Sequence, residues 1–164
     1  MNKQLLLEQL LVALSLIREQ ALGAAMQAYN SATADENIAE NKYDTLGLEA
    51  SYLAQGQAQR VAECEEDMAA YKSLKVEDFS ERKPISLGAL IHVVDEQGLE
   101  QYLFLGPKAG GLSFRYVDGP DQKDIKIITP SSPIGAALLK REVGEEIELN
   151  VGGSTHCYEI VSVC

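Results

Sequence analysis

The chain has 164 residues, which allows one globular domain or two small modules and excludes a large multidomain enzyme. Its 25 acidic against 14 basic side chains give a net charge of −11. We expect no independent DNA binding, because an acidic surface repels the phosphate backbone. With 46% hydrophobic residues, the composition is typical of a folded protein.

The cysteines and the N-terminus indicate a cellular compartment. Cys64, Cys157 and Cys164 form no CxxC pair and leave an odd thiol, so a disulfide framework and a cysteine metal site are both disfavoured. The leucine-rich N-terminus is interrupted by charged residues, and no run reaches the 18 or more apolar residues of a membrane span. We therefore expect a cytoplasmic protein that makes no contact with membranes.

The first 73 residues are predicted to be helical. They contain no proline and three glycines, whereas all five prolines and the other ten glycines lie between residues 84 and 153. Apolar residues in the first stretch recur at alternating spacings of three and four, which is typical of a helix packed against one partner helix. These residues are Leu7, Leu10, Leu14, Ile17, Ala21, Ala24 and Ala28.

A second apolar seam follows a polar segment at residues 30–41, which suits a turn or a new helix start. The second seam has the same spacing, with one slip around Gln57. It consists of Tyr43, Leu46, Ala50, Leu53, Val61, Cys64, Met68 and Tyr71. Two helices of roughly 30 residues make an antiparallel hairpin about 45 Å long.

The charged stretch at residues 74–84 ends in a proline and is predicted to be a linker. Beyond it, alternating apolar residues and turn signals predict strands at 87–94, 101–105, 112–117, 124–128, 146–151 and 156–163. Ser132 as an N-cap and Pro133 at the first helical position predict one short helix at residues 133–139.

Three segments of this C-terminal part resemble the signature of Gre-type bacterial transcription elongation factors. They are 132–139 (Ser-Pro-Ile-Gly-Ala-Ala-Leu-Leu), 142–147 (Glu-Val-Gly-Glu-Glu-Ile), and Gly152-Gly153 with 158–161 (Tyr-Glu-Ile-Val). The resemblance implies an α+β protein, in which an N-terminal antiparallel α-helical coiled-coil hairpin precedes a C-terminal FKBP-like β domain with one short helix. The expected boundaries are 1–73 for the hairpin, 74–84 for the linker and 85–164 for the β domain.

The resemblance also implies a partner. In the family, the β domain docks at the rim of the RNA polymerase secondary channel, and the coiled coil enters it and presents acidic tip residues to the catalytic Mg²⁺. The family motif Asp-x-x-Glu-Asn places its last two residues on Glu40 and Asn41 and its first on Asn37, an amide that binds Mg²⁺ more weakly than a carboxylate. The candidate tip residues are Asp35, Glu36, Glu40, Asn41 and Asp44.

The expected function is therefore that of a Gre-like regulator that binds RNA polymerase and contacts nascent RNA only indirectly. It has no cofactor of its own, and Glu40 with Asp35 or Asp44 would share the polymerase Mg²⁺. The chain itself would not be an enzyme, because the polymerase active site would catalyse any RNA cleavage. Whether it stimulates cleavage or only competes for the channel stays open.

The residues are also compatible with other interpretations. Peptidyl-prolyl isomerase activity follows from the FKBP-like fold alone, and the chain lacks the tryptophan of those enzymes. The hairpin could instead pair with another protein or with itself. The tip acids could simply favour a helix start. Phe104, Phe114 and Tyr116 belong either to the β core or, if one side is exposed, to a docking patch for polymerase.

Three further candidate sites are disfavoured by their spacing or by the local sequence pattern. His156 and Cys157 are adjacent and would point to opposite faces of a strand, which disfavours a metal cluster with His92 or Cys164. Capping explains Ser132 better than a hydrolytic pair with a histidine does. The glycine pairs at 110–111 and 152–153 lack a phosphate-binding pattern and are expected to be turns.

Overall fold

A computed structural model describes residues 1–33, 46–75 and 83–164. The chain divides into two compact units. One consists of Leu11–Ala69, and the other combines Met1–Leu10 with Ala70–Cys164. The first unit is helical and the second contains the sheet.

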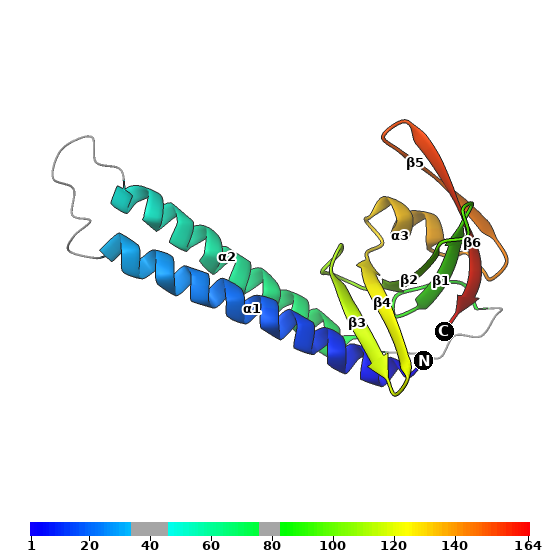
Figure 1. Cartoon of the computed structure of the whole chain (residues 1–164), viewed down its shortest axis with the longest axis horizontal. Helices are drawn as coiled ribbons and strands as arrows, with labels where there is room; N and C mark the ends of the chain where they lie inside the picture. The colour runs from blue at the N-terminus through cyan, green and yellow to red at the C-terminus, as the bar shows by residue number, and fades with distance from the viewer. Residues whose placement is uncertain (34–45, 76–82) are drawn as a thin grey trace. The chain divides into compact units, whose positions relative to one another are not determined.

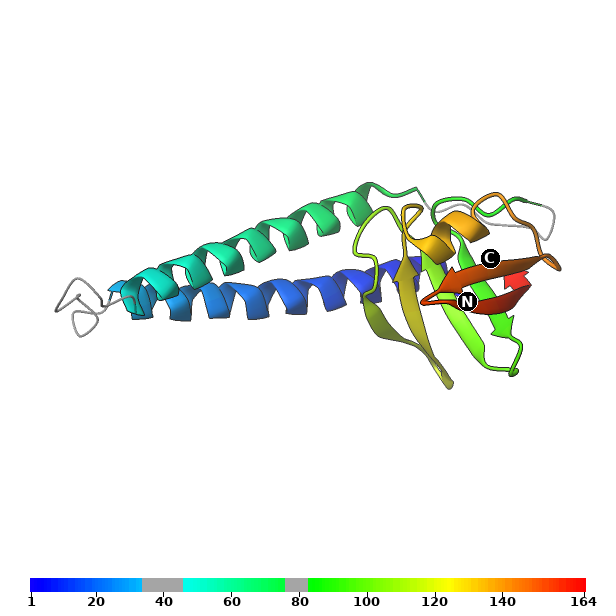
Figure 2. The same cartoon turned by 90° about the horizontal axis from the view of Figure 1, so that it is seen from above.

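The helical unit is an antiparallel pair of long helices. Helix α1 spans Lys3–Thr33 and helix α2 spans Leu46–Ser73, and the two lie side by side in both views (Figures 1 and 2). The seam predicted on α1 is confirmed, because Leu14, Ala21 and Ala28 are buried and Ile17 and Ala24 are half-buried. The predicted coiled-coil hairpin is thus present in the described residues.

The seam on α2 differs from the prediction at its middle. Leu53 is 56% exposed, and the half-buried Ala54 and Gln57 continue the seam instead. Three-and-four spacing continues without a slip, because the apolar side of a two-helix seam follows a seven-residue repeat even where that places a glutamine inside. The seam consists of Ala50, Ala54, Gln57, Val61, Cys64, Met68 and Tyr71.

The second unit is built on one six-stranded sheet. Its strands are β1 Leu90–Asp95, β2 Glu100–Leu105, β3 Ser113–Asp118, β4 Asp121–Ile128, β5 Glu146–Val151 and β6 Ser154–Val163. The strand order is β3-β4-β2-β1-β6-β5, in which β2 and β4 are parallel and the other neighbours antiparallel. All six predicted strands form, and so does the short helix α3, Pro133–Leu138.

One face of the sheet carries the main hydrophobic core with α3. Alternate residues such as Ile91, Val93 and Leu103 point into it, together with Leu138 of the helix. Ser132 caps α3, because its Oγ accepts a hydrogen bond from the Gly135 N–H at 3.2 Å. A Cβ at Gly135 would lie 2.0 Å from the Thr129 carbonyl oxygen, so only glycine fits there.

The opposite face of the sheet is partly covered by the ends of the two helices that belong to this unit. The backbone N–H of Asn2 donates to the Tyr116 hydroxyl at 3.0 Å. The side-chain amide of Gln9 donates to the Val117 carbonyl at 2.7 Å and accepts from the Val117 N–H at 2.9 Å. Since β3 is an edge strand, Gln9 satisfies backbone groups that a neighbouring strand would otherwise bind.

Candidate functional site

The predicted tip lies outside the described residues. Residues 34–45 connect the end of α1 at Thr33 to the start of α2 at Leu46. They include every residue of the predicted acidic tip and of the predicted shared Mg²⁺ site, namely Asp35, Glu36, Asn37, Glu40, Asn41 and Asp44. These assignments stay predictions.

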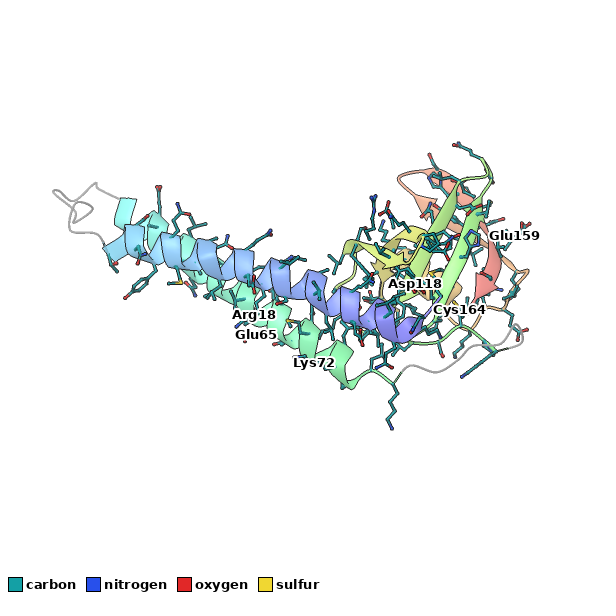
Figure 3. The ribbon with its side chains drawn as sticks, turned by 60° about the horizontal axis from the view of Figure 1, so that its bottom comes forward. Arg18, Glu65, Lys72, Asp118, Glu159 and Cys164 are labelled. Atoms are coloured by element: carbon teal, nitrogen blue, oxygen red, sulfur yellow. The ribbon has the colours of Figure 1, made fainter. Side chains whose placement is uncertain are left out.

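The described shaft of the hairpin is acidic and solvated. Arg18 of α1 and Glu65 of α2 form an ion pair of 2.7 Å across the two helices (Figure 3), and Arg60 lies 3.7 Å from Glu63. Both pairs are largely exposed, so each contributes at most about 1 kcal/mol. Arg18 and Arg60 are the basic side chains of the described part of Leu11–Ala69, which therefore offers little to a nucleic-acid backbone.

Two of the three aromatic docking candidates belong to the protein interior. The Phe104 and Tyr116 side chains are 0% exposed, whereas Phe114 is half-buried. Phe104 lies 6.4 Å from the ring of Tyr71, measured between ring centroids. The Tyr116 hydroxyl donates to Asp118 at 3.0 Å, and burial raises the pKa of Tyr116 above its usual value. A partner cannot reach the first two rings in this structure.

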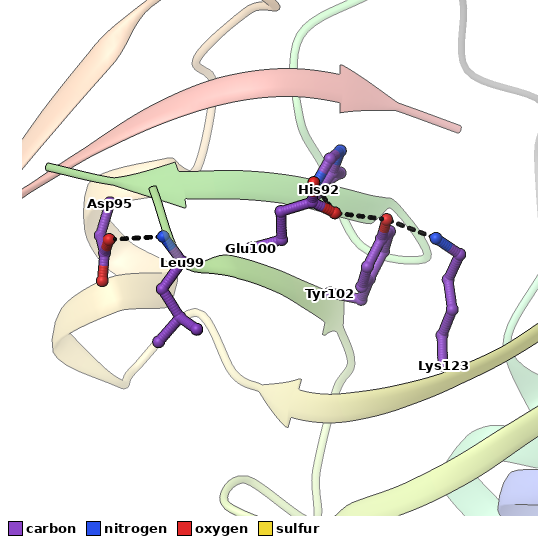
Figure 4. Close-up of polar contacts among 6 residues, drawn as sticks. All are labelled: His92, Asp95, Leu99, Glu100, Tyr102 and Lys123. Atoms are coloured by element: carbon purple, nitrogen blue, oxygen red, sulfur yellow. Dashed lines mark hydrogen bonds and ion pairs between the residues drawn. The ribbon is translucent and has the colours of Figure 1, made fainter. Parts of the chain in front are cut away.

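A polar cluster that the sequence did not indicate joins strands β1, β2 and β4 (Figure 4). The rings of His92 and Tyr102 are stacked, with centroids 4.5 Å apart. Lys123 covers the Tyr102 ring at 3.9 Å and donates to its hydroxyl, and that hydroxyl donates to Glu100 at 3.2 Å. Both faces of the tyrosine are occupied, so the cluster ties strands together and leaves no open ring for a ligand.

A shallow surface cavity lies where the β1–β2 turn meets β6. It is lined by Asp95, Glu96, Gln97, His156, Cys157 and Tyr158. A hydrogen bond to Glu96, burial and nearby acids raise the pKa of the Cys157 thiol to about 11. Among residues 1–33, 46–75 and 83–164, no group of three or more His, Cys, Asp and Glu side chains is arranged to hold a metal ion.

None of the helices in the described part of the chain is long and apolar enough to cross a membrane.

Comparison with known proteins identifies relatives. A family model described as "Transcription elongation factor, GreA/GreB, C-term" matches residues 117–164. The transcription elongation factor GreA of Bartonella tribocorum is 30% identical over 148 residues, covering 89% of this chain and 85% of that protein. GreA of Mesorhizobium japonicum is 31% identical over 140 residues, covering 84% of this chain and 80% of its own.

Solved structures were also matched. The GreA factor homolog 1 (Gfh1) protein of Thermus thermophilus is 21% identical with a TM-score of 0.38, covering 96% of this chain and 92% of that one. The transcription elongation factor GreA/GreB from Nitrosomonas europaea is 27% identical with a TM-score of 0.36, covering 61% of this chain and 78% of its own.

The match to the family model covers the end of β3 and all later elements, and the similarity to GreA of Bartonella tribocorum covers 89% of the chain. By this similarity, the chain belongs to the GreA/GreB family of transcription elongation factors.

Proposed function

We propose that this protein regulates transcription elongation by binding RNA polymerase in the cytoplasm. Its β domain would dock on the polymerase surface, and its hairpin would enter the secondary channel. The observation that carries the proposal is the similarity to proteins named transcription elongation factor GreA over 89% of the chain. The two-helix hairpin, whose helices are joined by the acid-rich residues 34–45, supports it.

The chemistry assigned to the tip is that of hard oxygen ligands. Carboxylates suit Mg²⁺, and an added carboxylate beside the polymerase metal can hold a second ion and orient water for phosphodiester cleavage. Glu40 is the residue proposed for this role, with Asp35 or Asp44 as a second ligand. The chain would supply metal ligands, and the polymerase active site would catalyse the RNA cleavage. The protein is therefore proposed to be an accessory factor.

A second candidate function is that of a channel competitor without cleavage activity. The specific observation in its favour is Asn37, which stands where the family motif has an aspartate. An amide oxygen carries no charge and binds Mg²⁺ less strongly than a carboxylate. A factor of this kind would occupy the channel and exclude other factors without promoting cleavage.

The test measures cleavage of nascent RNA in backtracked elongation complexes, with and without the protein, and in competition with an established Gre factor. Acceleration of cleavage supports the first candidate, and suppression of the competitor without acceleration supports the second. Glu40→Ala is expected to remove acceleration and to leave polymerase binding intact. Glu63→Ala, on the exposed shaft of α2, is the matched control and should change neither.

A protein that neither binds polymerase nor affects the competitor, under conditions in which the Gre factor does both, would overturn the proposal.

A further inference from the structure

The turn that follows helix α3 contains a lysine in a backbone conformation that suits glycine. Lys140 has a φ of 68°, which lies in the left-handed region. Among the described residues, Ala109 is the only other non-glycine residue with a positive φ. A side chain makes this conformation unfavourable, because its Cβ comes too close to the following carbonyl oxygen. The lysine therefore lowers the stability of the turn.

The surrounding chain imposes this conformation on residue 140. The N–H of Lys140 donates to the Ile85 carbonyl at 2.8 Å, and the N–H of Ile85 donates to the Arg141 carbonyl at 2.8 Å. The N–H of Arg141 donates to the Leu138 carbonyl at 3.0 Å, at the end of the helix. Because Ile85 is fully buried, these bonds hold the turn in place. Glycine would adopt the same backbone without strain.

The described contacts of the Lys140 side chain do not offset this strain. Lys140 is exposed and forms no ion pair with the described part of the chain. The neighbouring Arg141 pairs with Glu145, at 3.1 Å from Nη1 to Oε1. Glu142 is exposed as well, so the turn is no broad basic patch. Its distinguishing feature is one unpaired ammonium group that extends from a fixed backbone.

A strained residue of this kind points to a function. Residues held in an unfavourable backbone region cluster at functional sites, where the surrounding structure fixes them. The lysine ammonium is a compact point charge suited to a single carboxylate of a partner. A nucleic-acid backbone is disfavoured as that partner, because the net charge of −11 repels phosphates. The observations therefore favour an acidic group on a protein.

We propose that Lys140 is a docking residue of the β domain, and that its ammonium group pairs with a carboxylate on the RNA polymerase surface. The inference rests on the proposed function, in which the β domain docks on polymerase. It adds the residue and the chemistry of one contact. The pair explains why a lysine stands where glycine would be more stable.

The test measures binding of full-length variants to core RNA polymerase without nucleic acid, and the thermal unfolding of each variant alone. Lys140→Gly should weaken binding about fivefold, the upper range for one exposed ion pair. The same variant should unfold about 2–4 °C higher, because the backbone strain is removed together with the charge. A lysine that served only the fold would not produce these opposite effects.

A charge series at this position tests the chemistry of the contact. Lys140→Arg should bind polymerase like the natural chain, and Lys140→Gln should bind about fivefold more weakly. Lys140→Glu should weaken binding tenfold or more, because it brings like charges together. The difference between the natural chain and Lys140→Gln should shrink as ionic strength rises, since salt screens an exposed pair.

Two control variants separate the backbone effect from the charge effect. Ala109 has a φ of 56°, so Ala109→Gly relieves the same kind of strain without removing a charge. It should raise the unfolding temperature and leave polymerase binding unchanged. Lys126→Gln removes another exposed lysine, from the extended backbone of β4. It should change neither quantity.

The outcomes distinguish this inference from the proposed function. If the natural chain does not bind polymerase while a Gre factor does, both are overturned. If the natural chain binds and Lys140→Gly binds equally well, only the role of Lys140 is overturned. A lower unfolding temperature of Lys140→Gly would assign the lysine a structural role, and equal weakening by Lys126→Gln would reduce the effect to net charge. A loss that appears only when RNA is present would assign Lys140 to a phosphate and overturn the carboxylate pair.

Discussion

Tyr71 and Gly106 show how closely the backbone of the β unit approaches a buried ring. The Tyr71 side chain is 1% exposed and donates its hydroxyl to the Lys108 carbonyl at 2.7 Å. A Cβ on Gly106 would lie 2.0 Å from the Tyr71 hydroxyl oxygen and 2.8 Å from the ring carbon that bears it. The tyrosine fits because residue 106 has no side chain.

Gly106→Ala is therefore expected to destabilise the protein by roughly 1–3 kcal/mol, the usual cost of forcing an extra carbon into a packed site. Gly56→Ala is the control, and its expected effect has the opposite sign. Gly56 is helical, and a Cβ added there would have no atom within 4 Å. Alanine at this position should therefore stabilise α2 by about 0.5–1 kcal/mol. Urea unfolding measures both. A neutral Gly106→Ala would mean that the Tyr71 ring can move aside at no cost.

Cys157 is expected to react slowly with alkylating agents. Its pKa of about 11 leaves only a small thiolate fraction at pH 8, about a hundredfold below that of a thiol of pKa 9. The rate of iodoacetamide labelling at this residue should keep rising until the pH passes about 11. Because the hydrogen bond to Glu96 is the largest cause, Glu96→Gln should lower the pKa and speed labelling at pH 8. Equal rates in both proteins would contradict this cause.

At the scale of the element, one pair of residues on α2 allows a prediction about the stability of the hairpin. Gln57 is half-buried in the seam and Leu53 is exposed beside it. Gln57→Leu should raise the stability of the hairpin by about 1 kcal/mol, because an apolar side chain replaces an amide in the helix contact. Leu53→Gln should change the stability by less than about 0.5 kcal/mol. Thermal melting followed by circular dichroism measures the stability of both variants. A larger change for Leu53→Gln than for Gln57→Leu would support a seam with a slip.

These two residues also show why the helix pattern was only partly predictable. Hydrophobicity favours Leu53 for the seam, and a seam that includes Leu53 reaches Val61 and Cys64 only with a slip. The structure keeps the repeat and accepts Gln57 inside, because the path of two supercoiled helices is set by the whole seam. On α1, where leucines and alanines occupy the repeat without interruption, the predicted seam and the observed one agree at Leu14, Ala21 and Ala28.

The strands were predictable from alternation and turn residues, but their pairing was not. The parallel contact of β2 with β4, in which Tyr102 pairs with Ile125, skips over β3. Local sequence patterns carry no information about such a non-local neighbour. The contact of Lys123 with Tyr102 depends on this pairing, whereas His92 and Tyr102 lie opposite each other in the antiparallel pair of β1 and β2.

At the scale of the whole molecule, the contacts of the first ten residues could not be predicted either, because local sequence patterns carry no information about non-local neighbours. Asn2 and Tyr116 are 114 positions apart, and Gln9 and Val117 are 108 apart. The sequence placed residues 1–73 together by their helical pattern, whereas the compact unit that holds the sheet also includes Met1–Leu10. The proposed tip rests on the sequence motif alone, so functional assays test its assignment.

Asn37→Asp is the substitution that tests the tip in the whole molecule. It restores the family motif with Glu40 and adds a charged oxygen ligand, so the proposed function predicts an increase on the order of tenfold in the rate of polymerase-dependent RNA cleavage, equivalent to about 1.4 kcal/mol. Asn37→Ala should behave like the natural chain if the amide contributes little to Mg²⁺. Affinity for polymerase, measured by competition with a Gre factor, should be the same for all three proteins. If Asn37→Asp leaves the rate unchanged while Glu40→Ala abolishes it, the second metal ligand comes from Asp35 or Asp44, and position 37 does not face the metal.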